Sequence, residues 1–506
     1  MRAGILCAVA VLAVGCGGAG GRDIVSGRDL PGGTGTPDIE RVIDLGELGP
    51  LPAKGPMPRP DSDGDFVVGE LVLIEGDDFS KLPTVTIGGR PTETIARTGN
   101  GGIICRIPPE IPTGQVKVEV SHPGGKGSFD LDVRRYGLVV QPDTNTLYFF
   151  EAGPTGVATP KGTIDIPGAR DVAFSADGAA AYVSADAVGG EPAGIAIVTM
   201  PSGGGPHMIR RMALDGPTAP VIRHAARAPI AAIVHGRKLS LLDTRVARTP
   251  SIYTTIDLPG PAGSVAVDPE GRAAAALLPA GNQLVPIDLA KPALARAGGS
   301  VGLLPDEKVP LLIDGHFAPD GRELWVVAGD NRESVVAGAR PTRLIIVKVD
   351  RRADATVSRN VEVSGAAAPL ALAVARRESI GAAAAIRSDR RRAAIVLAAI
   401  NRVFIQPREG VPLNELGEIG QLVRTDLDGQ AQVLATARSV FSDADISHDL
   451  EWVATATTRV GGQSGESDPE FGVSVVPLAG GKQTFVRLGK ATTQGLFVEG
   501  SVALAP

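Results

Sequence analysis

The chain has 506 residues, of which 43% are hydrophobic and 21% charged, so it is long enough for more than one domain and too apolar to be disordered as a whole. Its formal net charge is −6, which argues against nucleic acid or an anionic membrane surface as the main partner. Six His, three Cys and 4% aromatic residues leave little material for metal clusters or stacking platforms. We therefore expect the sequence to indicate location and architecture more clearly than activity.

Residues 1–16 have the pattern of an export signal. Arg2 gives a positive start, and residues 5–14 are apolar but too few to span a bilayer, which takes about 20 residues. The end of the segment, LAVGC, resembles the lipobox of bacterial lipoproteins, although Ala13 stands where that motif usually has Leu. The resemblance implies that Cys16 receives lipid and becomes the new N-terminus. A plain signal peptide is the alternative.

Location follows from the same resemblance. Gly17 stands where lipoproteins that stay in the inner membrane usually carry Asp, so the resemblance implies an outer-membrane lipoprotein of the cell envelope. Residues 17–60 are rich in Gly and Pro and low in apolar periodicity, a composition typical of a flexible linker. We expect one short ordered segment within this linker, at residues 39–48.

Residues 61–135 alternate short apolar runs with turn signals. Strands are predicted at 70–75, 84–87, 102–107 and 115–120, and the last of these, QVKVEV, alternates Val with polar residues like a strand with one wet face. Strands of this length and spacing favour a small β-sandwich. The motifs LVLIEGDDF, TVTIGGRP and IICRIPPEIPTGQVKVEV resemble the IPT/TIG immunoglobulin-like family. That resemblance implies a spacer or binding module without catalytic residues.

Two features of this domain have alternative interpretations. Cys105 lies in a strand-like segment with no Cys or His near it in sequence, so we expect a buried apolar side chain instead of a reactive thiol. Asp61, Asp63 and Asp65 could suggest a calcium loop, but the Gly and Glu of such a loop are not at the required positions. We interpret these carboxylates as part of a solvated turn.

Residues 136–506 contain an imperfect repeat in which an apolar strand, a polar turn and a second apolar strand form a hairpin. The clear copies are 139–150, 172–184, 265–278 and 316–328, and the weaker ones are 222–234, 372–386 and 444–456. Many copies are followed by a third strand. The turns recur at a mean spacing of about 50 residues, which is the length of a propeller blade.

Stacking such sheets in a ring buries their apolar faces, so we expect a β-propeller of seven blades, with six as the alternative. The final strand, within 495–504, is expected to complete the first blade. Units such as HFAPDGRELWVVA resemble the YVTN-type, lactonase-like and TolB-like propeller families. The predicted fold is therefore all-β: an IPT/TIG sandwich at 61–135 followed by a propeller at 136–506.

No catalytic, cofactor-binding or metal-ligating residues are predicted, because zinc motifs and phosphate-binding loops are missing from the sequence. The stretch at 462–466, GQSGE, is interpreted as a loop and not as a nucleophile elbow. His224, His316 and His448 occupy comparable places in their repeats and could meet on one face. We expect instead that they are unrelated structural histidines. Carboxylates recur in the repeat turns and are interpreted as acceptors of backbone N–H groups: Asp143, Asp177, Asp268, Asp320 and Asp449.

The sequence favours a non-enzymatic, lipid-anchored envelope protein that binds an envelope protein or a glycan, with membrane attachment through the N-terminal lipid and no cofactor. One alternative is a lactonase-like propeller hydrolase with its site in the central channel. Another is a TolB-like factor in envelope assembly. Partner identity and oligomeric state do not follow from the sequence.

Overall fold

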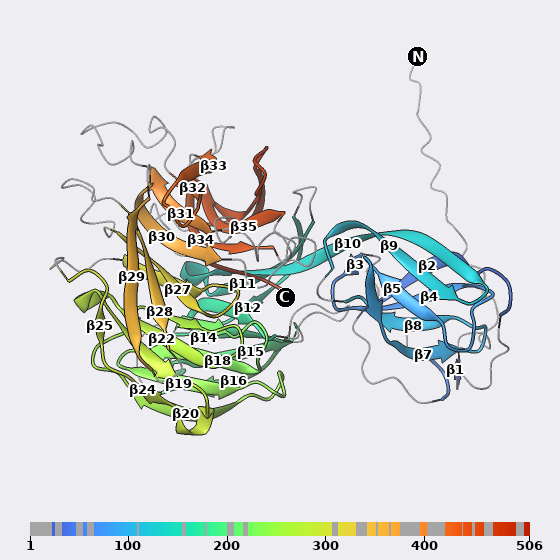
Figure 1. The fold of residues 1–506 in the computed structure, drawn as a ribbon, viewed down its shortest axis with the longest axis horizontal. Coiled ribbons are helices and arrows are strands. Elements are labelled where there is room, and N and C mark those ends of the chain that lie inside the picture. The colour runs from blue at the N-terminus through green and yellow to red at the C-terminus, as the bar shows by residue number, and fades with distance from the viewer. Residues whose placement is uncertain are drawn as a thin grey trace, which may run out of the picture.

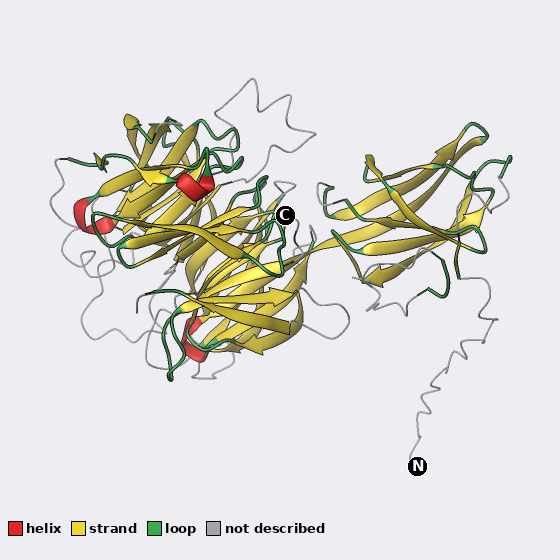
Figure 2. Cartoon of the chain, turned by 90° about the horizontal axis from the view of Figure 1, so that it is seen from below, coloured by secondary structure: helices red, strands yellow, loops and turns green. Residues whose placement is uncertain are grey.

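The fold is seen in a computed structural model. It describes residues 23–25, 33–46, 54–57, 65–108, 111–153, 158–176, 178, 180–199, 207–215, 221–305, 312–329, 342–350, 353–363, 366–374, 395–401, 420–437, 439–447, 451–459, 469–491 and 500–505. These residues form two β domains, which lie at the two ends of one long strand (Figure 1). Within them, no helix is long and apolar enough to cross a membrane. The helices described are the short 3-10 turns η2 (Pro142–Thr144), η3 (Pro279–Gly281) and η4 (Pro292–Leu294), drawn red in Figure 2.

The first domain, here called the sandwich domain, packs two sheets around one apolar core. One sheet has the order β1 (Ile24–Val25), β7 (Thr94–Thr98), β8 (Ile103–Arg106), β4 (Leu71–Asp77), β2 (Asp38–Gly46). The other has β6 (Arg90–Thr92), β5 (Thr84–Ile87), β9 (Gly114–His122), β10 (Gly125–Gln141), with β3 (Phe66–Val67) parallel to β10. The strands predicted at 70–75, 84–87, 102–107 and 115–120 are confirmed as β4, β5, β8 and β9.

The stretch 17–60 is not linker throughout, which corrects the sequence-based interpretation. β2 pairs with β4 along its length, and β1 pairs with β7, so both strands belong to the sandwich domain. The buried side chains of Ile39, Val42 and Leu45 explain why β2 is held, because they contribute to the apolar interior. The ordered segment expected at residues 39–48 is this strand, but its pairing with β4 places it in the sandwich domain and not in a linker.

The second domain is a ring of four-stranded antiparallel sheets, with one extra short strand in the fourth. The described residues give seven such sheets, each written from the inner to the outer strand: β38 (Ser501–Leu504), β10, β11 (Thr146–Ala152), β12 (Thr159–Asp165); β13 (Ala169–Phe174), β14 (Ala180–Ala185), β15 (Gly194–Thr199), β16 (His207–Ala213); β17 (Val221–His224), β18 (Ile230–His235), β19 (Lys238–Asp243), β20 (Ser251–Asp257); β21 (Ser264–Val267), β22 (Ala273–Leu278), β23 (Gln283–Asp288), β24 (Arg296–Ala297) with β25 (Val301–Gly302); β26 (Leu312–Phe317), β27 (Glu323–Gly329), β28 (Arg343–Val349), β29 (Ala355–Glu362); β30 (Ala366–Val374), β31 (Ile395–Asn401), β32 (Gly420–Thr425), β33 (Ala431–Ala437); and β34 (Ser439–Ile446), β35 (Trp452–Arg459), β36 (Glu470–Pro477), β37 (Thr484–Lys490).

The ring is closed, because each inner strand contacts the inner strand of the next sheet, from β38 through β13, β17, β21, β26, β30 and β34 back to β38. Middle strands are buried on both faces; β22, for example, reads AAAALL and is buried throughout. Its Ala274 and Ala276 pack against Ala232 and Leu241 of the preceding sheet. Small side chains allow the sheets to approach closely, and the apolar area between them stabilises the ring.

The predicted hairpins are confirmed for most copies of the repeat, and the predicted closing strand is β38, which pairs with β10. The copy at 372–386 is only partly described. Its first strand lies in β30, which pairs with β31 at Ile395–Asn401, and residues 375–394 lie outside the described residues.

The two domains share strand β10. Its first half pairs with β9 of the sandwich domain, and its second half pairs with β11 and β38 of the propeller (Figure 1). The expected boundary at residue 135 therefore falls inside a continuous strand. There the fully buried Arg135 donates to the carbonyl oxygens of Ala505 at 2.8 Å and Ile111 at 3.3 Å, joining the two domains.

Further contacts join the same two domains. Tyr136 on β10 donates a hydrogen bond to Glu70, and the indole N–H of Trp452 donates to Thr113 Oγ1 at 3.3 Å. Lys161 of β12 pairs with Asp65 at 2.6 Å. The shared strand and the buried polar contacts restrict motion of one domain relative to the other, so the sandwich domain and the propeller form one rigid unit.

Candidate functional site

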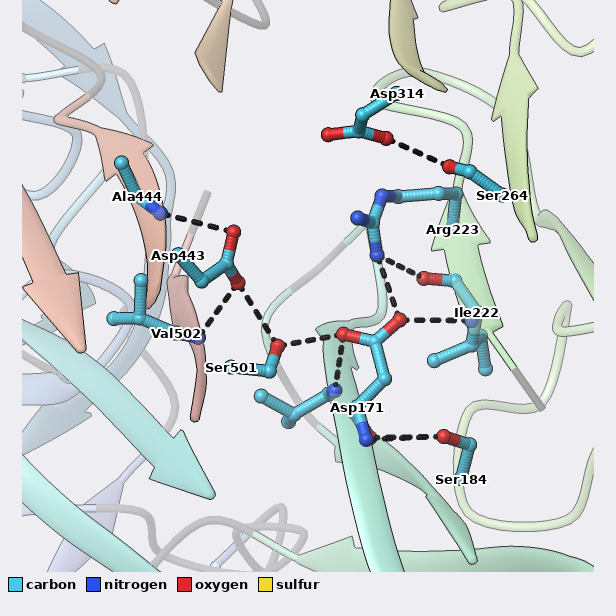
Figure 3. Close-up of polar contacts among 11 residues, drawn as sticks. Asp171, Ser184, Ile222, Arg223, Ser264, Asp314, Asp443, Ala444, Ser501 and Val502 are labelled. Atoms are coloured by element: carbon cyan, nitrogen blue, oxygen red, sulfur yellow. Dashed lines mark hydrogen bonds and ion pairs between the residues drawn. The ribbon is translucent and has the colours of Figure 1, made fainter. Parts of the chain in front are cut away.

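Polar side chains from the inner strands gather in the channel of the propeller (Figure 3). An inner strand has a sheet neighbour on one edge only, so N–H groups on its other edge need acceptors. Six inner strands supply a polar residue here: Ser501 (β38), Asp171 (β13), Arg223 (β17), Ser264 (β21), Asp314 (β26) and Asp443 (β34). We call these six residues the channel ring.

Carboxylates of the ring link neighbouring inner strands. Asp171 accepts from the backbone N–H of Val172 through Oδ1 and of Ile222 on β17 through Oδ2, both at 2.9 Å. Asp443 does the same with Ala444 and with Val502 on β38, again at 2.9 Å. Each Asp therefore ties its own strand to the next one around the ring, which is a sufficient structural reason for its presence.

The link to β38 is the most extensive. Asp445, two residues after Asp443 on β34, accepts from the N–H of Leu504 at 2.9 Å. Ser501 lies between two carboxylates, with its Oγ 2.6 Å from Asp171 Oδ1 and 3.0 Å from Asp443 Oδ2. A hydroxyl has a single proton, so Ser501 donates to one carboxylate at a time; when Asp443 is protonated, it can donate to Ser501 Oγ while Ser501 donates to Asp171.

Arg223 is the cation of the channel ring. Its Nη1 donates to Asp171 Oδ2 at 2.7 Å and to the carbonyl of Ile222 at 2.9 Å. Burial acts to lower the pKa of Arg223, but Asp171, Asp314 and Asp443 outweigh it and raise that pKa, so the guanidinium stays charged. Its Nε is buried and has no hydrogen-bond acceptor among the described residues.

The carboxyl group of Asp443 has a strongly raised pKa. Burial raises its pKa to about 7, and the negative charges of Asp171 and Asp314 act in the same direction. Arg223 and the N–H of Val502 oppose this rise by favouring the carboxylate. Asp443 therefore exchanges its proton near neutral pH, where an ordinary Asp is fully ionised.

A cavity of about 50 Å³ lies beside the channel ring, with room for roughly four waters at 10–15 Å³ each. Arg223, Asp443 and Asp445 contribute charged groups to its wall, and Val267, Pro269 and Phe317 contribute apolar surface. His224 and His316 also line it, so the structure brings together two of the three histidines that sequence placed at comparable positions. His448 lies outside the described residues.

His224 has a structural environment. Its Nδ1 is 2.6 Å from the carbonyl of Ala225, its Nε2 is 2.8 Å from Thr244 Oγ1, and its ring stacks on Tyr182 with centroids 6.0 Å apart. Because both nitrogens are engaged, the imidazole is held in place and is poorly suited to act as a base. This supports the structural interpretation for His224.

The described turn carboxylates do not line this cavity. Asp268 accepts from the backbone N–H of Arg272 at 2.9 Å, and Asp320 from that of Arg322 at 3.0 Å, which is the predicted role in the turn. Asp143 lies in the short helix η2. Asp177, Asp449 and the stretch 462–466 are outside the described residues, as is Cys16.

In the sandwich domain, Cys105 is fully buried, and burial raises the pKa of its thiol to about 12, so it is an apolar core residue as expected. Asp61 and Asp63 are outside the described residues. Burial acts to raise the pKa of Asp65, but ion pairs with Lys161 and Arg134 lower it overall. In the described part of the chain, no three His, Cys, Asp or Glu residues are placed to hold a metal ion.

The channel ring was not predicted from the sequence. Its signal is an Asp inside an inner strand, as in ARDVAF, LIDGHF and SDADI. Whether such a residue belongs to the channel ring depends on contacts between strands of different repeats, for example the hydrogen bond between Asp171 and Ser501.

The pKa of Asp443 predicts a pH effect on stability. Since the folded state holds this proton more tightly than the unfolded chain does, Asp443 contributes stability that is complete below pH 3.8 and is lost as pH rises from there to about 7. In Asp443→Asn this loss is absent, so the stability of the variant relative to wild type should rise by up to about 4 kcal/mol between pH 4 and 8. Urea unfolding across this range measures it.

The control for that experiment is Asp320→Asn, which changes an exposed turn residue of the same propeller. This substitution should cost less than about 1 kcal/mol in this pH range. If the difference in unfolding free energy between wild type and Asp443→Asn does not vary with pH, Asp443 does not titrate near neutrality.

The fold and its channel define a class: a β-propeller protein with an immunoglobulin-like domain continuous with its first blade. Residues 62–136 match the IPT/TIG domain family, which identifies the sandwich domain as an IPT/TIG domain. No curated protein matches the chain.

Three solved structures illustrate the likeness of the propeller. A Bacteroides fragilis protein provisionally assigned as a 6-phosphogluconolactonase is 11% identical, with a TM-score of 0.49, over 74% of this chain and 98% of its own. The periplasmic gluconolactonase of Pseudomonas aeruginosa is 12% identical, with a TM-score of 0.40, over 65% and 93%. Hydrazine synthase of Kuenenia stuttgartiensis is 13% identical, with a TM-score of 0.41, over 67% and 94%. Likenesses this distant, to proteins of different activities, do not bear on function.

Proposed function

We propose that this chain is an outer-membrane lipoprotein that acts as a binding module for an envelope protein or a glycan. The observation that carries the binding role is the cavity in the propeller channel, where a charged guanidinium and a carboxyl group meet apolar surface. A concave site with a few convergent polar groups is the usual form of a ligand site. The shared strand β10 supports the proposal, because it holds the propeller and its cavity in a fixed position relative to the sandwich domain.

The membrane attachment is proposed from the sequence around Cys16 and Gly17. It is tested by growing bacteria that express the full chain with an alkyne-tagged fatty acid and then separating their membranes. The wild-type chain should carry the label and sediment with the outer membrane, and Cys16→Ser should do neither. Cys7→Ser is the matched control and should behave like wild type. Label on Cys16→Ser, or none on wild type, would contradict the anchor.

The binding role is tested by cross-linking the full chain in intact cells and identifying what it captures. Val267→Phe puts a larger side chain into the cavity and changes no residue of the channel ring, and Val267→Ala leaves the cavity open. A reproducible envelope partner or glycan that is lost in Val267→Phe and kept in Val267→Ala supports the proposal. The proposal is contradicted if no partner is captured, or if the captured partner is also kept in Val267→Phe.

One observation favours a second candidate, a hydrolase with its site in the channel. An acid that titrates near pH 7 beside a cavity is suited to proton transfer, and Asp443 has this property. A panel of lactones and esters tests it with the same protein. Turnover by wild type that disappears in Asp443→Asn would replace the binding role with catalysis.

A further inference from the structure

We infer that the channel cavity binds one edge of a neutral ligand rich in hydroxyl groups, such as a saccharide unit. This deepens the proposed binding role and rests on it. The inference follows from three properties of the described residues: where hydrogen-bond donors remain, which charges surround them, and how large the cavity is.

The donors come from Arg223. Only Nη1 of its guanidinium donates to the described residues, leaving Nε, which is buried, and Nη2. In Figure 3 the guanidinium lies between Asp314 and Asp171, with Asp443 across from it. A buried N–H without an acceptor is costly, so a ligand oxygen placed here gains a charge-assisted hydrogen bond.

The charges exclude most other ligands. Arg223 is one cation among the carboxyl groups of Asp171, Asp314 and Asp443, which all raise its pKa and so lie within electrostatic range. The surroundings are therefore negative even when Asp443 is protonated, and a phosphate or carboxylate would be repelled. A cation would face Arg223 itself, and a hydrocarbon would leave the polar wall without hydrogen bonds.

A hydroxyl group can bind both the donors and the acceptors of the cavity. It accepts from the Arg223 N–H groups and donates to Asp443, whose Oδ1 accepts only from Ala444 among the described residues. Space for roughly four waters matches the hydroxyls along one edge of a sugar ring, with the remainder of the ligand outside. The apolar surface of Val267 and Pro269 suits the C–H faces of such a ring.

The test is calorimetric titration of the full chain with free sugars: methyl glucoside, galactose and N-acetylglucosamine, together with the 6-phosphates of glucose and galactose. At least one neutral sugar should bind, and a phosphorylated form should bind at least tenfold more weakly. Binding should fall at least tenfold in Arg223→Lys, which keeps a cation beside Asp171 but loses the two free donors, and should be lost in Val267→Phe. The control is Arg227→Lys, which should bind like wild type. Arg227 lies in the turn after β17 and does not line the cavity.

The inference is overturned if no neutral sugar binds, if the phosphorylated forms bind more tightly, or if both cavity variants keep wild-type affinity. Urea unfolding of each variant shows whether it is folded. If Arg223→Lys is unfolded, the result for Val267→Phe tests the inference. The titration needs neither lipid nor partner, so a failed Cys16 labelling leaves it untouched. A captured protein partner without any sugar affinity would support the proposed function and refute this inference.

Discussion

A chain that ends at residue 499 is expected to lose cooperative folding. The truncation removes β38, the strand that closes the ring, and exposes the edge of β10. Val502 and Leu504 are both buried, and burial of such side chains contributes about 1.5–3 kcal/mol each. The polar consequences add to this loss, because Asp443 and Asp445 each lose a backbone donor inside the propeller.

The expected cost also extends to the junction of the domains, since Arg135 loses the carbonyl of Ala505. The sum is on the order of 5–10 kcal/mol, against a typical total stability of 5–15 kcal/mol. We therefore expect an insoluble product or a broad, non-cooperative urea transition. Removal of Pro506 alone is the control and should leave the wild-type transition. A truncated chain with an unchanged midpoint would show that β38 is dispensable for ring closure.

The sequence anticipates the repeated part of this fold well, for physical reasons. Hairpins such as VAVDPEGRAAAALL show their strands and their turn within one short window, so local signals suffice. Ring closure was also predictable, because a last strand that completes the first blade removes an exposed edge. The outer strands, such as β16 and β20, are largely exposed and lack the apolar pattern that would indicate them.

Features that depend on distant pairing could not be predicted. An ordered segment was expected at residues 39–48, but its membership of the sandwich domain was not, because that depends on pairing with β4, as in Ile43 with Leu73. The boundary expected at residue 135 lies where β10 changes partners, but the continuity of this strand through both domains depends on pairing with distant strands and could not be predicted. The channel ring joins residues as far apart as Asp171 and Ser501, so no single stretch of sequence contains it.

Asp171→Ala is expected to be the most damaging single substitution in the channel ring. Asp171 accepts from Val172, Ile222, Arg223 and Ser501, and all four donors lose their acceptor together. Removing one partner of a buried ion pair typically costs 3–5 kcal/mol, because the remaining charge is left uncompensated. Urea unfolding at pH 7 measures this loss. Asp320→Ala, at an exposed turn, should cost less than 1 kcal/mol.

Two companion variants separate the charge of Asp171 from its hydrogen bonds. Asp171→Asn keeps one acceptor oxygen but not the charge, so it should fall between wild type and Asp171→Ala. The double variant Asp171→Ala with Arg223→Met removes the stranded cation as well, and it should be more stable than Asp171→Ala alone. If the second substitution instead adds its full cost to the first, the uncompensated guanidinium is not the source of the instability. The carboxylate would then act mainly as the backbone link between β13 and β17.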